Sequence, residues 1–213
     1  MNSLKNMLIA VDGPAASGKG TLAKSLATHF GLRYLDTGLI YRAVSLELIS
    51  KKRDSSDEKF AIAAASNITE NDLLRPELRD EKVASVASVV ASYPRVRKAV
   101  IDYQRSFAAE PPGAVLDGRD IGTVVCPDAT AKIYLDANLE VRALRRSKEL
   151  HDKGTKSIES RVLFEMKERD KRDRERNVAP LSIAEDAYII DTSYLGCDQV
   201  FERAITFVLS KSG

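Results

Sequence analysis

The feature that most constrains this chain is a glycine-rich stretch, GPAASGKGT, at residues 13–21. Gly13, Gly18 and Lys19 fit the phosphate-binding pattern G-x-x-x-x-G-K-[ST]. Such glycines let backbone N–H groups converge on phosphate oxygens, and the start of a following helix adds partial positive charge. The pattern departs at one position, because Gly20 stands where Ser or Thr normally ligates Mg²⁺. We therefore expect a phosphate-binding loop that holds its metal without a hydroxyl at that position.

Five short apolar runs predict the strands of a buried parallel sheet, because each ends at a polar residue or a glycine. They are Met7–Val11, Arg33–Leu35, Ala114–Leu116, Ala131–Leu135 and Tyr188–Ile190. The segment Thr21–Phe30 has apolar residues at helical spacing and is followed by Gly31, which often ends a helix. Strands that alternate with helices form right-handed crossover units. The sequence therefore predicts an α/β fold of three layers, with a five-stranded parallel sheet in the middle.

Acidic residues follow the predicted strands. The aspartates in these places are Asp12, Asp36, Asp117, Asp136 and Asp191. Parallel sheets bind ligands at the carboxyl ends of their strands. These carboxylates are therefore expected to line the ligand-binding edge of the sheet.

Two regions interrupt the alternation of strands and helices and are predicted to be excursions from the core. Residues 38–113 have a mainly helical pattern, and residues 142–176 carry 13 Lys and Arg against 8 Asp and Glu. The core then consists of residues 1–37, 114–141 and 177–213, which is enough for one substantial hydrophobic core. The first excursion would cap one end of the sheet, and the second would move over it.

Composition argues against several broad classes of protein. The net charge of +2 argues against wholesale coating of nucleic acid. Cys126 and Cys197 have no second Cys or His at metal-ligand spacing, so neither a zinc site nor a disulfide framework is expected. No stretch approaches the roughly 18 apolar residues of a membrane span, and the first residues lack the apolar core of a signal peptide. We expect a cytoplasmic protein, and a monomer, because no oligomerisation pattern stands out.

Gly20 has no hydroxyl to ligate Mg²⁺, and this restricts the kinds of phosphate chemistry that the loop could support. Motor and switch NTPases use the hydroxyl directly after the lysine as a metal ligand. Here Mg²⁺ would rest mainly on nucleotide phosphates and water, which suits an ion that commonly keeps several waters. Asp117, at a predicted strand end, is the candidate to hold those waters, although an Asp before Gly118 is also typical of a turn. The G-K-G-T variant resembles that of nucleoside monophosphate kinases such as adenylate kinases, which implies phosphoryl transfer.

Six segments, taken in order, resemble the bacterial cytidylate (CMP) kinases. They read GPAASGKGT, YLDTGLIYR, YPRVR, DGRDIGTVV, PDATAKIYLDA and KERDKRDRERNVAPL. Together they span nearly the whole chain, which makes the set specific although no single segment beyond the first is decisive. The chain departs from longer members of the family near Asn67–Arg79, where it is shorter and shows no strand pattern.

The resemblance implies a phosphate-loop NTPase fold with two insertions. Residues 38–113 would be the CMP-binding insertion, and residues 142–176 the lid with an arginine-rich helix, in which Arg145 and Arg146 occupy lid positions. The implied reaction moves a phosphoryl group from ATP to CMP, and also to dCMP, with Mg²⁺, in pyrimidine nucleotide metabolism. The expected ATP-binding residues are Gly13, Pro14, Ala15, Ala16, Ser17, Gly18, Lys19, Gly20 and Thr21, and Lys19 would also be catalytic.

The acceptor carries a phosphate and a base, so its site needs cations for the first and mixed donors and acceptors for the second. A carboxylate can accept a hydrogen bond from the 4-amino group of cytosine, whereas uracil presents a carbonyl oxygen at the same position. The resemblance assigns the cytosine contacts to Thr37, Arg119 and Asp120. Taken alone, the Arg119–Asp120 pair could also form a local salt bridge. Arg42, in the same segment as Thr37, and Arg97 are further expected CMP ligands.

Arg169, Asp173 and Arg176 are spaced to share one face of a helix. Such a pattern is also typical of a solvated helix with internal ion pairs. Beside a phosphate loop, arginine forks can bridge donor and acceptor phosphates and neutralise charge during transfer. The resemblance implies that Arg169 and Arg176 serve the acceptor phosphate and sugar and act in catalysis, and that Asp173 contacts the ribose.

Two other functions are compatible with the phosphate loop. One is a kinase for another small acceptor, such as UMP, AMP or shikimate. The other is an ATP- or GTP-dependent switch that transfers nothing. Gly20 argues against the switch, as does the lack of the guanine-binding motif N-K-x-D.

Overall fold

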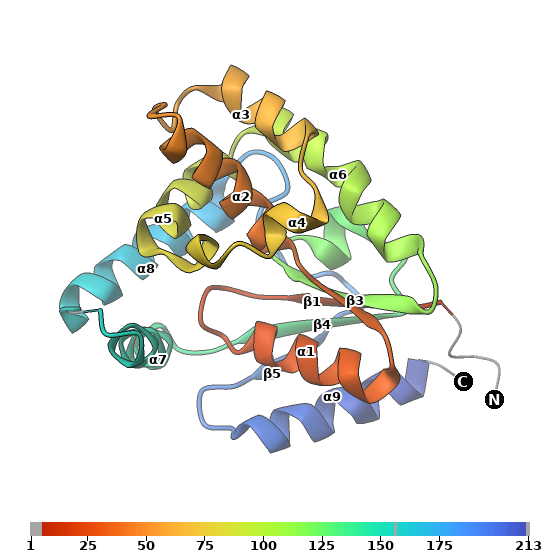
Figure 1. Cartoon of the computed structure of the whole chain (residues 1–213). Helices are drawn as coiled ribbons and strands as arrows, with labels where there is room; N and C mark the ends of the chain where they lie inside the picture. The colour runs from red at the N-terminus through yellow and green to blue at the C-terminus, as the bar shows by residue number, and fades with distance from the viewer. Residues whose placement is uncertain (1–5, 156, 212–213) are drawn as a thin grey trace. The chain divides into compact units, whose positions relative to one another are not determined.

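A five-stranded sheet is the centre of the fold in the computed structural model, which describes residues 6–155 and 157–211 (Figure 1). The strands are β1 (Met7–Asp12), β2 (Arg33–Asp36), β3 (Gly113–Gly118), β4 (Ala131–Asp136) and β5 (Tyr188–Asp191). Their order is β2-β3-β1-β4-β5, with β1 parallel to β3 and β4, and β4 parallel to β5. The predicted α/β fold is confirmed.

Each observed strand continues through the aspartate that the sequence pattern placed just after it. Backbone pairing explains this difference, since the ladder needs no apolar side chain to extend by one residue. Val11 pairs with Asp117, and Asp136 pairs with Asp191. Asp12, Asp117, Asp136 and Asp191 therefore belong to paired strands, which fixes their positions more firmly than a loop would.

The described residues divide into two compact units. One comprises the residues up to Leu35 and from Ala108 onward, and the other comprises Asp36–Phe107. The division falls close to the ends of the region 38–113 that was predicted to be an insertion. The described part of the charged region 142–176 belongs to the first unit.

The first unit contains the sheet and its covering helices. Its helices are α1 (Lys19–Phe30), α7 (Leu139–Asp152), α8 (Glu159–Glu175), α9 (Cys197–Lys211) and the short π-helical turn η2 (Ile121–Val125). Helices α1 and α9 pack beside each other and cover one face of the sheet (Figure 1). Leu22 and Leu26 of α1, Ile133 of β4 and Val208 of α9 are buried in one apolar cluster between them. This packing holds α1 against β3 and β1.

The second unit is built from helices. They are α2 (Thr37–Ser50), α3 (Glu58–Ser66), α4 (Glu70–Leu73), the 3₁₀ helix η1 (Pro76–Arg79), α5 (Glu81–Val90) and α6 (Pro94–Ala109), whose end extends into the first unit. Helix α2 contacts α3, α5 and η1, and Leu46, Leu78 and Val83 are buried in a small core there. Aspartate side chains cap α2, α3 and α5. Among the described residues, none of the helices in either unit is long and apolar enough to cross a membrane.

Replacement of Leu26 by Ala should lower the free energy of unfolding by about 2–5 kcal/mol, because it removes buried methyl groups and leaves a cavity. Leu26 is fully buried, whereas Leu209 of α9 is 52% exposed. Leu209→Ala is therefore the matched control and should cost less than about 1 kcal/mol. Urea denaturation followed by circular dichroism measures both values. Equal losses for the two variants would contradict the proposed packing of α1.

Candidate active site

The glycine-rich stretch forms the turn that leads from β1 into α1. The helix begins at Lys19, two residues before the predicted start, and Gly18 caps it in a left-handed conformation with a φ of 95°. Ala16 is also left-handed, with a φ of 58°. A Cβ atom at Gly13 would lie 2.1 Å from the carbonyl oxygen of Leu135, so only glycine lets the loop approach β4 this closely. The first N–H groups of an α-helix have no partner within the helix, so the turn from β1 into α1 has the form that phosphate binding requires.

The position of Gly20 faces a carboxylate. A Cβ atom there would lie 3.2 Å from Oδ2 of Asp117, closer than an ordinary van der Waals contact. Asp117 is buried at the end of β3, and the hydroxyl of Tyr34 donates to its Oδ2 over 3.4 Å. A serine or threonine at this position would therefore require the Asp117 carboxylate to shift by a few tenths of an ångström. This arrangement links the two sequence predictions, because the missing hydroxyl and the candidate metal residue lie at the same place.

The side chains near Asp117 could supply only part of the coordination of a metal ion. In the described residues, no group of three or more His, Cys, Asp or Glu side chains could hold a metal ion on its own. A metal ion beside Asp117 would therefore take most of its oxygen ligands from a nucleotide and from water, which is a coordination that Mg²⁺ accepts. The residues present are compatible with that ion.

Asp12 anchors the turn that follows the Arg119–Asp120 pair. Its Oδ1 accepts the N–H of Ile121 and its Oδ2 accepts the N–H of Gly122, each over 2.8 Å. Burial raises the pKa of Asp12 from 3.8 to about 6, although the two N–H donors oppose this shift. The sequence identified Asp12 only as a strand-end acid, because its partners lie far along the chain.

Four predicted residues come together between the end of β3 and α8. Nε of Arg119 donates to Oδ2 of Asp173 over 2.8 Å, and Nη2 of Arg176 donates to Oδ1 of Asp120 over 3.4 Å. Both carboxylates are buried. Both residues of the Arg119–Asp120 pair therefore contact α8, and the helix that could have been merely solvated is joined to the strand ends.

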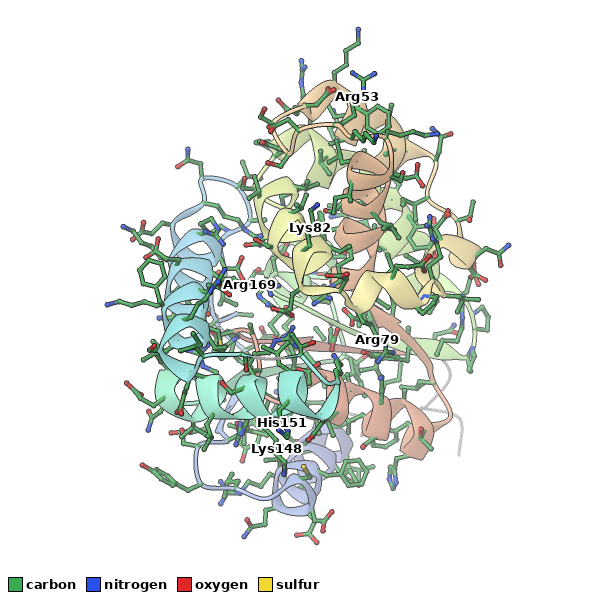
Figure 2. All side chains as sticks on the ribbon, turned by 60° about the vertical axis from the view of Figure 1, so that its left-hand side comes forward. Arg53, Arg79, Lys82, Lys148, His151 and Arg169 are labelled. Carbon is green, nitrogen blue, oxygen red and sulfur yellow. The ribbon has the colours of Figure 1, made fainter. Side chains whose placement is uncertain are left out.

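The charges of this cluster balance one another. Burial alone would raise the pKa of Asp173, but the guanidinium groups of Arg119 and Arg169 hold that pKa below its ordinary value. Arg169 lies one turn before Asp173 on α8 (Figure 2). Asp173 thus stays ionised and fixes Arg119 at the strand end.

Three predicted CMP ligands lie in the second unit. Thr37 is the buried first residue of α2. Arg42 donates to the carbonyl oxygen of Leu78 over 2.8 Å. Arg97 lies over the ring of Tyr41, 5.5 Å from its centroid. Each arginine is thus held within its own unit, with its charge close to a backbone carbonyl or an aromatic ring.

The charged region contains one buried arginine that sequence reasoning missed. Arg142 is 3% exposed, and its Nη2 donates to Oδ2 of Asp170 over 2.6 Å. Of the two predicted lid arginines, Arg145 donates to the carbonyl oxygen of Thr192 over 2.6 Å, and Arg146 pairs with Glu149 on its own helix. Figure 2 shows two further basic side chains of the same helix, Lys148 and His151. In a sequence this rich in charge, no local feature marks Arg142 as the buried one.

Replacement of Asp12 by Asn should change how stability depends on pH. Because the folded state raises the pKa of Asp12 to about 6, its protonated form stabilises the fold at low pH, and this contribution is lost as pH rises through that value. The free energy of unfolding of the wild type, minus that of Asp12→Asn, should therefore fall by up to about 3 kcal/mol between about pH 4 and about pH 7. Urea titrations across this range measure the difference. A difference that does not change with pH would contradict the raised pKa.

Comparison with known proteins agrees with this geometry. A sequence profile of the family described as Cytidylate kinase matches residues 9–210. The cytidylate kinase of Paramagnetospirillum magneticum (strain ATCC 700264 / AMB-1) is 53% identical over 207 residues, which cover 96% of this chain and 98% of that protein.

Two solved structures share the fold at low sequence identity. An uncharacterized protein from Eubacterium ventriosum has a TM-score of 0.57 at 16% identity and covers 96% of this chain and 99% of its own. A gluconokinase from Sinorhizobium meliloti 1021 has a TM-score of 0.52 at 13% identity and covers 97% and 94%. These likenesses concern the fold alone. The family profile and the 53% identity over nearly the full length establish more than the fold: the chain belongs to the cytidylate kinase family.

Proposed function

We propose that this protein transfers the terminal phosphoryl group of ATP to CMP, giving ADP and CDP, and that it also accepts dCMP. The observation that carries this proposal is the 53% identity with a cytidylate kinase over 96% of the chain. The phosphate loop and the pairing of Arg119 and Asp120 with α8 support it. Kinases for other small acceptors, such as UMP, AMP or shikimate, are not favoured by these relatives.

The loop at residues 13–21 would bind the phosphates of ATP. Its left-handed residues and the start of α1 support this role, because both direct N–H groups toward an anion. Lys19 would stabilise the charge of the phosphoryl group during transfer. In the structure its Nζ donates to the carbonyl oxygen of Pro14 over 3.1 Å, so the side chain already turns back over the loop.

The base of CMP would be recognised by Thr37, Arg119 and Asp120. A buried carboxylate held at a strand end is a suitable acceptor for the 4-amino group of cytosine. The carbonyl of uracil at that place would repel it. The phosphate and sugar of CMP would be held by Arg42, Arg97, Arg169, Asp173 and Arg176. Of these, Asp173 is suited to a ribose hydroxyl, because its lowered pKa keeps it an acceptor.

Asp117 would hold waters of a Mg²⁺ ion bound with ATP. When bound, Mg²⁺ neutralises charge on the phosphate oxygens and keeps donor and acceptor in line. The role of this chain is to offer a carboxylate where other phosphate loops offer a hydroxyl. The close approach of Asp117 to the Gly20 position supports that substitution of one oxygen ligand by another.

The transfer itself would need no general base, because the acceptor oxygen of CMP is already ionised near neutral pH. Catalysis would come from alignment of the two nucleotides and from positive charge around the moving group. Lys19, Arg169 and Arg176 would supply that charge. Residues 142–176 would act as a lid that excludes water and so suppresses hydrolysis of ATP. The cytoplasmic location and the monomeric state stay predictions from the sequence.

The acceptor is tested by measuring ADP release from Mg·ATP in the presence of CMP, dCMP, UMP, AMP or GMP. We expect kcat/KM to be highest for CMP and dCMP, because cytosine offers Asp120 an amino group at the position where uracil offers a carbonyl. Release that is greater with UMP would overturn the assignment of the base site. Release that ignores every monophosphate would instead support a nucleotide-dependent switch.

Lys19→Ala should lower kcat by about 10²–10³-fold, because it removes a cation that stabilises charge in the transition state. The same ADP-release assay at saturating ATP and CMP measures this loss. Circular dichroism and the melting temperature control for folding. A variant with kcat within about tenfold of the wild type would rule out this role for Lys19.

Asp120→Ala should lower kcat/KM for CMP by at least about tenfold, because one charged hydrogen bond to the base is lost. The KM for ATP should change little. The ratio of kcat/KM for CMP to that for UMP should fall in the same variant. If that ratio is unchanged, Asp120 does not recognise the base.

A further inference from the structure

Two carbonyl oxygens of the phosphate loop are held by side chains from outside the loop. Nη1 of Arg142, in α7, donates to the carbonyl oxygen of Ala15 over 3.3 Å. The hydroxyl of Thr192, just after β5, donates to the carbonyl oxygen of Ser17 over 3.0 Å. Both donor residues are 3% exposed. The hydrogen bond to Ser17 is buried, and that to Ala15 is partly buried.

The direction of these carbonyls decides where the loop points its donors. In a trans peptide unit, the C=O of one residue and the N–H of the next point to opposite sides. A fixed carbonyl at Ala15 therefore fixes the N–H of Ala16, and a fixed carbonyl at Ser17 fixes the N–H of Gly18. These are the two left-handed residues of the loop, a conformation that costs a non-glycine residue roughly 1 kcal/mol or more. Without the outer donors, nothing in the local sequence favours this shape at Ala16.

The environment of Thr192 determines which way its hydroxyl donates. Its backbone N–H donates to the carbonyl oxygen of Asp136 over 2.8 Å, which fixes the residue at the end of the sheet. Nη1 of Arg145 donates to the Thr192 hydroxyl oxygen over 3.0 Å. Because that oxygen already accepts from a guanidinium group, its own proton is directed to Ser17. Arg145 thus acts on the loop through Thr192.

The hydrogen-bond acceptors around Arg142 match the geometry of a guanidinium group. Its Nε donates to the carbonyl oxygen of Ala137 over 2.8 Å and its Nη2 donates to Asp170 over 2.6 Å. Together with the bond to Ala15, three acceptors in different segments share one planar fork. A lysine ammonium group has no such fork and could not serve all three in the same geometry. Arg142 therefore joins the loop to α8, the helix that also carries Arg169.

We propose that Arg142 and Thr192 are positioning residues that hold the phosphate loop in its nucleotide-binding shape before ATP arrives, which rests on the proposed binding of ATP by this loop. They act through the backbone of Ala15 and Ser17, and they lower the cost of ordering the loop when the nucleotide binds.

The test is calorimetric titration of the protein with ATP alone. Thr192→Val keeps the shape of the side chain and loses the hydroxyl, so the Kd for ATP should rise by about 3- to 10-fold. Thr192→Ser keeps the hydroxyl and should stay within about twofold of the wild type. Thr206→Val is the matched control, because the Thr206 hydroxyl donates to the carbonyl oxygen of Glu202 on the exposed side of α9, over 2.9 Å.

Kinetics separate a positioning role from a merely structural one. In Thr192→Val the KM for ATP should rise with the Kd, while the KM for CMP stays near that of the wild type. A structural role would lower the melting temperature of the free protein and leave the Kd for ATP unchanged well below that temperature. A Kd for ATP in Thr192→Val equal to that of Thr206→Val would therefore overturn the proposal.

A second variant tests the other donor. Arg142→Lys keeps the charge and should raise the Kd for ATP by about tenfold, with exposed Arg203→Lys on α9 as its control. The double variant Arg142→Lys, Thr192→Val should lose less than the product of the two single effects, because both donors order one loop. Fully independent effects would contradict a shared action on the loop. Binding of ATP alone decides these outcomes, so they do not depend on which monophosphate the protein phosphorylates.

Discussion

The parallel register of β1 with β3 and β4 is the constraint on which the rest of the site depends. It pairs Val11 with Asp117 and Asp12 with Tyr134, so the three strands end at one edge and the phosphate loop leaves from the middle of it. A slip of one residue would turn every side chain of a strand to the other face. Asp117 would then no longer lie against the start of α1. Backbone hydrogen bonds between strands thus determine where the chemistry of the side chains takes place.

Buried ion pairs join α8 to the end of β3 and to α7, and their electrostatics alone are not expected to stabilise the fold. Arg119 with Asp173 and Arg142 with Asp170 lie within hydrogen-bond distance in buried surroundings. Removing such charges from water costs free energy that the attraction between them often only offsets. Apolar residues of similar volume would fill the same space at no electrostatic cost. The pairs fix the directions of the two guanidinium groups, which apolar packing could not do, and that of Arg142 also donates to the phosphate loop.

The sequence was sufficient for the features that depend on local pattern. Apolar runs predicted all five strands, and Gly13, Gly18 and Lys19 predicted the loop between the first strand and helix. Contacts between distant segments carry no such pattern. The hydrogen bond from Thr192 to Ser17 joins positions 175 residues apart, and that from Arg142 to Ala15 spans 127. Their donors are ordinary residue types, and only the folded register brings them to the loop.

The contact between Gly20 and Asp117 also restricts how this site could change over generations. A hydroxyl side chain at Gly20 would meet the Asp117 carboxylate, since even its Cβ atom would lie 3.2 Å from Oδ2. Loss of Asp117 on its own would remove the carboxylate and leave bare glycine in front of it. A substitution at either position therefore changes the surroundings of the other. The two positions are in contact, so the effects of substitutions at them are not expected to add, and an exchange of carboxylate for hydroxyl here would involve both.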